Sequence, residues 1–364
     1  MQALSLYAGP AAREHIRQHG LLPGHIRTIP AAAGGPKGLI LGPLDQHLFG
    51  QWLPQSQQPV DLVGASIGAW RMATACLDQP VAAFERLEHD YIHQHYELSP
   101  GQRMPPARLV SEEFGRNLRS FYGGRVHEVL RHPRYRLHIV TSRGRHMLGR
   151  EHRLRTPLGY LGAFLSNSVQ RRAMGAWLER TVFSAPDASG LGKSALPFAA
   201  GDYRTRQLAL DEANFYPVLQ ASCSIPFVLQ AVHDIPGAPP GAYWDGGITD
   251  YHLHLNYAAA RGPGLVLYPH FQRAVVPGWL DKALKWRHRA THFLDNMLLL
   301  APHPEWIKTL PNGKLPDRKD FTHYGNDLAG RVQAWSRAVQ MSRQLAEEFQ
   351  AWLERPDPAR LQAL

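Results

Sequence analysis

The sequence predicts an α/β protein in which a mainly parallel sheet is flanked by helices, with further helices at the C-terminal end. Three observations support this prediction. Two β-prone runs, Arg27–Ala33 and Val60–Val63, each lead through a glycine-containing turn into a helical pattern of apolar residues. This order of strand, turn and helix, given twice in succession, is typical of parallel strands joined by covering helices. With 44% hydrophobic residues over 364 positions, the chain can also bury a large core.

Each predicted element follows from a local pattern. Apolar residues recur at helical spacing after both turns; the first set is Ile40, Leu44, Leu48 and Trp52, and the second is Ile67, Trp70, Thr74 and Leu77. Further helices are expected over Pro10–Gly20, Val81–Tyr96 and Ser111–Leu130, and strands over Arg136–Thr141, Arg206–Leu210 and Leu265–Tyr268, the last of the sheet. The stretch from Ser184 to Thr205 is rich in Ala, Ser, Gly and Pro, which predicts a loop or lid.

The composition changes beyond about Pro269. The segment Trp279–Leu294 is rich in Lys, Arg and His, and its apolar residues share one face at helical spacing, so we expect a basic amphipathic helix there. Such a helix can lie in a membrane interface or pack on the protein. A proline-rich connector then leads to a long helix with apolar residues from Leu328 to Trp352. We therefore expect an α/β domain over residues 24–271 and a basic helical extension, residues 272–364, packed on it.

The charge balance points to an anionic partner. The chain has 40 Lys and Arg against 30 Asp and Glu, a formal net charge of +10. This favours contact with phospholipid headgroups, nucleic acid or an acidic protein. The arginine-rich region Arg103–Arg155 has few aromatic residues and no known nucleic-acid module, so a solvated or headgroup-facing surface is favoured and nucleic acid is not expected.

The cysteines and the hydropathy indicate a compartment. Cys76 and Cys223 are the two cysteines of the chain, too few for a disulfide scaffold, and a reducing cytosol is the default. The first residues lack the basic start and long apolar core of a signal peptide. No run approaches the roughly 20 apolar residues of a spanning helix. We expect a cytoplasmic protein that is at most peripheral to an anionic membrane surface.

A candidate nucleophile lies in the second turn. The run Gly64-Ala-Ser66-Ile-Gly68 follows the strand and precedes the helix. G-x-S-x-G in this position suits a sharp turn that lifts the serine hydroxyl clear of the sheet. Small residues on either side are needed because the chain packs closely around such a turn. Ser66 is therefore the candidate.

The first turn, Gly34-Gly35-Pro36-Lys37-Gly38, can direct backbone amides at an anion. The anion is either a nucleotide phosphate or the oxyanion of acyl transfer. Nothing in the chain matches the phosphate-binding pattern; Gly192-Lys193-Ser194 imitates its end, but Asp187 stands where the first glycine belongs. Because sequential parallel strands are usually neighbours, both turns should open on the same sheet edge.

A serine nucleophile needs a base. Asp245 follows a short apolar strand and precedes Gly246 and Gly247, which allow close approach of the backbone. If Asp245 bonds Ser66 directly, the pair is a dyad without a histidine. Asp-Gly is also a strong signal for a hairpin turn, and the residues alone do not decide between these readings.

These segments resemble the three motifs of the patatin-like phospholipases, in that family's order: Ala33-Gly-Gly-Pro-Lys-Gly38, Gly64-Ala-Ser-Ile-Gly68 and Asp245-Gly-Gly247. The segment Ala221–Pro226 is similar to a fourth family segment, and the likeness spans Ile29–Tyr268. The resemblance implies a three-layer α/β/α sandwich that hydrolyses lipid acyl esters without metal or cofactor. It implies Ser66 as nucleophile, Asp245 as base, and the amides of Gly34, Gly35, Lys37 and Gly38 as an oxyanion hole.

This chain departs from the family in the first motif. Ala32-Ala33 stand where the family commonly has Asp-Gly, and Lys37 stands where it usually has arginine. Lysine keeps the positive charge without the planar fork of arginine. Pro36 has no amide hydrogen to donate, so the neighbouring residues must supply the donors of the hole.

Alternatives remain from the residues alone. His252, His254 or His270 follows Asp245 in the chain order Ser, Asp, His and would complete a triad esterase. A thioesterase or acyltransferase would use the same acyl-serine, and a lipid-binding pseudo-hydrolase would keep the fold without the reaction. The four-apart histidine pairs His89–His93 and His288–His292 lack a third ligand, so no metal is expected.

Overall fold

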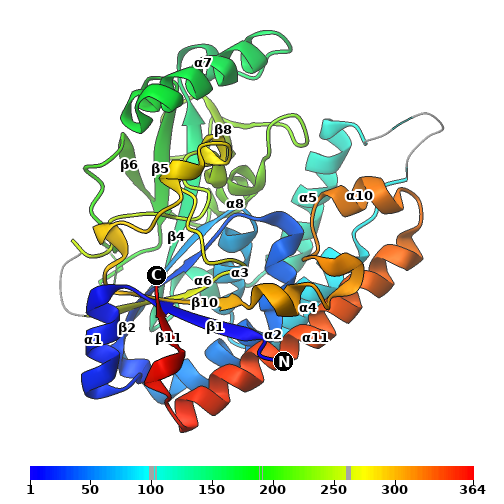
Figure 1. The fold of residues 1–364 in the computed structure, drawn as a ribbon. Helices are drawn as coiled ribbons and strands as arrows, with labels where there is room; N and C mark the ends of the chain where they lie inside the picture. The colour runs from blue at the N-terminus through cyan, green and yellow to red at the C-terminus, as the bar shows by residue number, and fades with distance from the viewer. Residues whose placement is uncertain (98–101, 103–104, 188, 191, 260–263) are drawn as a thin grey trace.

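The fold is that of a computed structural model, which describes residues 1–97, 102, 105–187, 189–190, 192–259 and 264–364. Arg103, which opens the arginine-rich region, lies outside these residues. The described residues form an eleven-stranded sheet flanked by helices (Figure 1). The predicted three-layer α/β/α class with a mainly parallel central sheet is confirmed.

Strands from all parts of the chain join this sheet. Its members are β1 (Leu4–Ala8), β2 (Ile26–Ala31), β3 (Val60–Ala65), β4 (Tyr135–Gly144), β5 (Leu178–Ser184), β6 (Thr205–Ala209), β7 (Val232–His233), β8 (Ala242–Asp245), β9 (Leu265–Pro269), β10 (Met297–Pro302) and β11 (Leu361–Ala363). The order is β11–β1–β10–β9–β2–β3–β4–β5–β6, with β8 antiparallel on β4 and β7 on β8. The pairs from β10 to β4 are all parallel.

Helices cover the sheet. They are α1 (Pro10–His19), α2 (Gly42–His47), α3 (Ile67–Ala75), α4 (Pro80–His93), α5 (Ala107–Tyr122), α6 (Val126–Leu130), α7 (Arg155–Val169), α8 (Phe215–Cys223), α9 (Pro304–Ile307), α10 (Lys319–Tyr324) and α11 (Leu328–Glu354). The long helix α11 packs on α2, α4 and β1, and its apolar residues at helical spacing are buried there. The central strands are buried on both faces, as expected for a parallel sheet covered by helices.

Most predicted elements are confirmed, because their patterns are local and strong. The two strand–turn–helix units are β2 followed by Gly35–Leu41 and α2, and β3 followed by α3. β2 and β3 are parallel neighbours, so both turns open on the same edge of the sheet, as predicted. Between β5 and β6 the described residues form no helix or strand, which agrees with the expected loop.

Two predictions for the C-terminal part are wrong. Trp279–Leu294 is no continuous helix but a series of short 3-10 turns. The Asp281 carboxylate accepts from Arg287 within the segment (2.9 Å) and from Asn167 (2.8 Å) and Arg171 (3.2 Å) outside it, and these contacts favour the turns over a regular helix. β9 is also not the last strand: β10 and β11 follow it into the same sheet. The structure also contains β1, β5 and α7, for which the sequence patterns predict no element.

No helix in the described part of the chain is long and apolar enough to cross a bilayer. No group of three or more His, Cys, Asp or Glu side chains in that part is arranged to hold a metal ion.

Candidate active site

The serine turn and the Asp245 strand meet along β4. β4 pairs with β3 as far as Ala65, opposite Val140, and with β8 at Asp245, opposite Thr141. β5 occupies the other edge of β4, so β3 and β8 share a single edge. Ser66 directly follows β3 and Asp245 ends β8. The register of the sheet therefore brings the two residues to the same point.

The turn at Ser66 is as sharp as predicted. Its backbone has φ 57° and ψ −131°, a conformation that costs a non-glycine residue about 1–3 kcal/mol. The flanking glycines permit it, since a Cβ added to Gly64 would lie 2.4 Å from Ala69 Cα, and one added to Gly68 would lie 1.9 Å from the Ala31 carbonyl oxygen. Backbone atoms cannot yield to such contacts. Close packing of the backbone thus holds the serine at the start of α3 in a strained conformation.

Ser66 and Asp245 are hydrogen-bonded. Ser66 Oγ donates to Asp245 Oδ2 at 2.6 Å, and the amide of Gly247 donates to the other carboxylate oxygen at 2.7 Å. Both side chains are buried. Because each carboxylate oxygen has its own donor, the carboxylate is held in one orientation toward the serine hydroxyl.

The surroundings favour a carboxylate that can take a proton. Burial raises the pKa of Asp245 above that of an ordinary aspartate, and the hydrogen bond from Ser66 and the positive charge of Arg318 offset part of this effect. General bases work best when the pKa lies close to the working pH. The raised pKa therefore makes this carboxyl a better proton acceptor than a solvated one.

The segment Ala221–Pro226 supports both residues. The amide of Ser66 donates to Ser222 Oγ at 3.0 Å, and this hydroxyl donates to the Val140 carbonyl at 2.7 Å. The amide of Asp245 donates to the Ser224 carbonyl at 2.9 Å. Ser222 and Ser224 thus position the backbone of the pair. The resemblance pointed to this segment, but no feature of the sequence singled out Ser222.

The glycine turn lies against the serine turn. Gly35 has φ +57° and lines the same cavity as Ser66. A Cβ added to Gly38 would lie 3.3 Å from the side chain of Ile67, the residue after Ser66. Gly34 precedes the 3-10 helix Gly35–Leu41 as its N-cap, where the first amides have no partner within the helix. The ammonium of Lys37 lies 5.1 Å from the centre of the Phe271 ring, and burial lowers its pKa.

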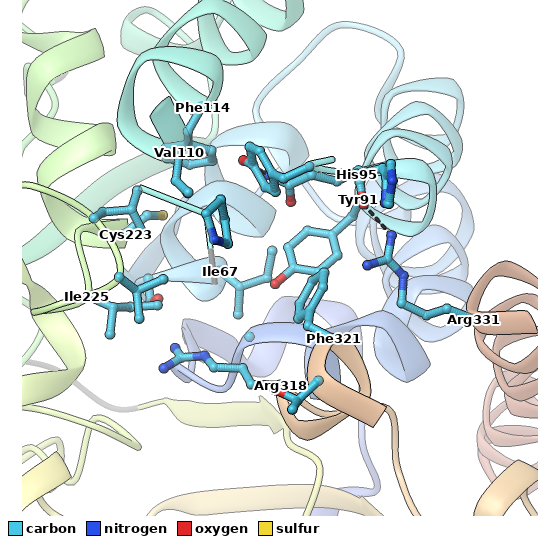
Figure 2. Close-up of a pocket in the computed structure, with 18 of the residues that line it drawn as sticks. Ile67, Tyr91, His95, Val110, Phe114, Cys223, Ile225, Arg318, Phe321 and Arg331 are labelled. Atoms are coloured by element: carbon cyan, nitrogen blue, oxygen red, sulfur yellow. Dashed lines mark hydrogen bonds between the residues drawn. The ribbon is translucent and has the colours of Figure 1, made fainter. Parts of the chain in front are cut away.

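A cavity of about 340 Å³ opens beside Ser66. Most of its lining is apolar or aromatic; Figure 2 shows Val110, Phe114, Cys223 and Ile225 along one side and Tyr91 and Phe321 on the other. Pockets of a few hundred Å³ with such walls suit apolar ligands. The serine hydroxyl is therefore placed at the wall of a site for an apolar group.

Two cations that sequence reasoning missed lie close to the pair. Arg318 lines both the cavity at Ser66 and a small hollow at Asp245. Lys282 lines the same hollow, and its ammonium lies 4.0 Å from the centre of the Tyr251 ring. Much of the Lys282 side chain is exposed, but desolvation of its charged end, followed by repulsion from Arg318 and Lys37, lowers its pKa to about 8. No local signal marks either residue, because one lies in a proline-rich connector and the other in a predicted helix.

The three histidines that could complete a triad form their hydrogen bonds with other groups. His252 Nδ1 contacts the Ala274 carbonyl (3.1 Å), His254 Nε2 lies 3.4 Å from Thr291 Oγ1, and His270 Nδ1 bonds the Gln272 backbone. Burial lowers the pKa of all three. Within the described ranges, no histidine hydrogen-bonds the side chain of Ser66 or Asp245.

Comparisons with known proteins give weak matches. No family model matches this chain, and no curated protein is similar to it. Among solved structures, it resembles VipD from Legionella pneumophila, with 13% identity, a TM-score of 0.38, and coverage of 89% of this chain and 67% of that one. It also resembles human GIVD cytosolic phospholipase A2, with 12% identity, a TM-score of 0.34, and coverage of 96% and 63%. This chain thus spans about two thirds of either protein, and neither likeness is close enough to decide its activity.

Proposed function

We propose that this protein is a serine lipid acyl hydrolase of the phospholipase A or esterase type, acting through a Ser66–Asp245 dyad. The observation that carries the proposal is the 2.6 Å hydrogen bond from the Ser66 hydroxyl to Asp245 at the wall of an apolar cavity. The Ser66 hydroxyl is hydrogen-bonded to a buried carboxylate whose pKa is raised, and this carboxylate can accept the hydroxyl proton. The apolar cavity offers room for an acyl chain.

The proposed reaction has two halves. Ser66 Oγ attacks the ester carbonyl carbon while its proton passes to Asp245 Oδ2, and the tetrahedral intermediate then expels the alcohol, which takes that proton. In the second half, water attacks the acyl-serine, again giving its proton to Asp245. Collapse of the second intermediate releases the fatty acid and returns the proton to Ser66. No metal or cofactor takes part in these steps.

We assign the oxyanion hole to the turn that begins at Gly34. The amides of Gly34, Gly35 and Lys37 are the candidate donors, with Gly38 giving the close approach to Ile67. Pro36 leaves one position of the turn without a donor. Arg318 lines the same cavity and adds positive charge where the oxyanion and an anionic headgroup would lie.

Labelling with a fluorophosphonate probe tests the proposal. The serine oxygen of an active hydrolase displaces fluoride from phosphorus and forms a stable bond. Wild-type protein should label, and Ser66→Ala should not. Ser56→Ala changes a serine that precedes β3, at the opposite end of this strand from Ser66, and should label as the wild type does. A well-folded wild-type protein that does not label would contradict the proposal in favour of a lipid-binding pseudo-hydrolase.

The charge of Arg318 should be visible in the pH profile. Because this charge lowers the pKa of Asp245, Arg318→Ala should raise that pKa further. The base would then be protonated at higher pH, so the acid limb of kcat/KM for a soluble ester should move to higher pH. Arg318→Lys retains the charge and should leave the limb close to its wild-type position. Identical acid limbs in all three proteins would show that Arg318 has no electrostatic role at the dyad.

A further inference from the structure

Helix α7 presents an apolar face to solvent. Its inward face is buried and consists of Thr156, Gly159, Tyr160, Ala163 and Asn167. Its outward face carries five aliphatic side chains that are 54–87% exposed, namely Leu154 at the N-cap, Leu158, Leu161, Leu165 and Val169. Steps of three and four residues place these five on one side of a helix. We call this row the α7 stripe.

The helix is firmly held, so the stripe is not a product of loose packing. A Cβ added to Gly159 would lie 2.6 Å from Leu148, and one added to Gly162 would lie 2.6 Å from the Trp177 ring. Trp177 Nε1 donates to Ser166 Oγ at 3.0 Å. The fold thus fixes the inward face and leaves the stripe outside. Figure 1 shows α7 at one end of the molecule.

Two exposed aromatic residues lie beside this helix. The Phe227 ring is 58% exposed, and its centre lies 6.1 Å from that of Tyr160 on α7. Trp286 is 66% exposed. Its neighbour Arg287 donates to Asn167 Oδ1 and to the Ser168 carbonyl near the end of α7, each at 3.3 Å. Exposed aromatic side chains thus lie near α7 in addition to the stripe, and large exposed apolar surfaces mark interaction sites.

The charges that flank the stripe along the chain have one sign. No Asp or Glu lies between Glu151 and Glu179, a segment that contains the whole of α7 and the exposed Arg153, Arg155 and Arg172. The segment between Asp281 and Asp295, which holds Trp286, also has no acidic residue and carries the exposed Lys285 and Arg289, whereas Arg171 and Arg287 pair with the buried Asp281. An apolar row bordered by arginine and lysine is complementary to a bilayer with anionic headgroups.

We propose that the α7 stripe and its bordering cations dock this protein on an anionic phospholipid bilayer. The leucines would enter the boundary between headgroups and acyl chains, and the arginines would contact phosphates. A second copy of this chain fits the surface less well, because a symmetric contact would bring like charges together. Nucleic acid would leave the leucines exposed.

One edge of the docking face, at Phe227, lies next to the candidate active site in the chain, and this part of the inference rests on the proposed hydrolase function. Phe227 follows Pro226, which lines the hollow at Asp245 together with Trp279 and Lys282. A bilayer seated on α7 and Phe227 would thus lie beside the small hollow at Asp245. The surface would bring the enzyme to lipid that is presented in a membrane rather than in solution.

Vesicle cosedimentation tests the docking surface without relying on activity. The probes are phosphatidylcholine vesicles with and without phosphatidylglycerol. Wild-type protein should bind the anionic vesicles, and Leu161→Ser/Leu165→Ser should bind them about tenfold or more weakly, since each leucine gains apolar burial in the membrane. Arg153→Glu/Arg172→Glu should also weaken binding. The matched control Leu22→Ser removes a leucine that is 55% exposed elsewhere and should bind as the wild type does.

Three results would overturn the proposal: wild-type protein that binds neither vesicle, α7 variants that bind as tightly as the wild type, or a wild-type dimer that these variants convert to monomer. Fluorophosphonate labelling of the same proteins separates the two proposals. Labelling of the leucine variant should equal that of the wild type and shows that it is folded. Vesicle binding that depends on α7 in a protein that never labels would retain the docking surface and reject the hydrolase.

Discussion

Asp245→Asn is expected to lower kcat/KM for ester hydrolysis by about 10²–10⁴-fold, the usual contribution of a general base. The amide has nearly the shape of the carboxylate and can still accept the hydrogen bond from Ser66. It cannot take the proton of the attacking hydroxyl, so the nucleophile loses its activation. Steady-state rates on a soluble ester, together with the rate of fluorophosphonate labelling, measure the effect.

The matched control for this change is Asp357→Asn. Asp357 caps a short turn by accepting a hydrogen bond from the Ala359 amide at 2.9 Å, and asparagine caps as well as aspartate does. Its activity and stability should equal those of the wild type. The residual activity of Asp245→Asn should also lose the acid limb that the raised pKa of Asp245 produces. Full activity with the original acid limb would require another base.

Asp250→Ala should destabilise the protein by about 3 kcal/mol, because the buried Arg180 would then keep, among the described residues, only the partly exposed Asp202, at 3.1 and 3.2 Å, as a carboxylate partner. Arg180 Nε and Nη2 donate to the two Asp250 carboxylate oxygens at 2.8 and 2.6 Å, and both side chains are fully buried. Asp250 lies in the turns that follow Asp245, so this pair also anchors the candidate base. Urea denaturation followed by circular dichroism gives the change in the free energy of unfolding.

An exposed ion pair supplies the contrast. Glu112 pairs with Arg108 on the surface of α5, where both side chains are largely solvated, and Glu112→Ala should leave the denaturation midpoint nearly unchanged.

The buried pair of Asp250 and Arg180 also predicts a pH dependence. Burial raises the pKa of Asp250, but pairing with Arg180 outweighs this and the net pKa is lowered. Its contribution to stability is thus complete above the pKa of the unfolded chain and is lost as the pH falls through the lowered pKa. If Asp250→Ala and Glu112→Ala lost the same free energy of unfolding, the special contribution of the buried pair would be contradicted.

The local patterns of the chain were sufficient for the central strands, the two turns and the helices after them. A β-prone run, a helical spacing of apolar residues or a glycine near a serine depends only on residues a few positions apart, and the same short-range sterics act in the folded protein. Asp245 is different, because it lies 179 positions from Ser66. The order of three motifs, and not any local pattern, suggested this pairing.

Elements that depend on long-range contacts could not be predicted in this way. The residues of Trp279–Leu294 have helical spacing, yet the buried Asp281 carboxylate binds three partners from distant and local segments and favours 3-10 turns over a regular helix. Similarly, β10 joins the sheet by pairing with β1 and β9, and β11 joins it by pairing with β1. In both cases tertiary contacts override local propensity.

The sequence by itself thus determined the α/β class, the serine turn and the candidates for base and oxyanion hole. Only the tertiary structure decided that β3 and β8 meet along β4 and bring Ser66 to Asp245, that Arg318 lies beside them, and that the leucines of α7 face outward. The physical reason is the distance along the chain over which each kind of interaction acts. Turn chemistry and hydrophobic period act between near neighbours in the chain, whereas strand register, buried charge and exposed surface depend on which distant segments pack together.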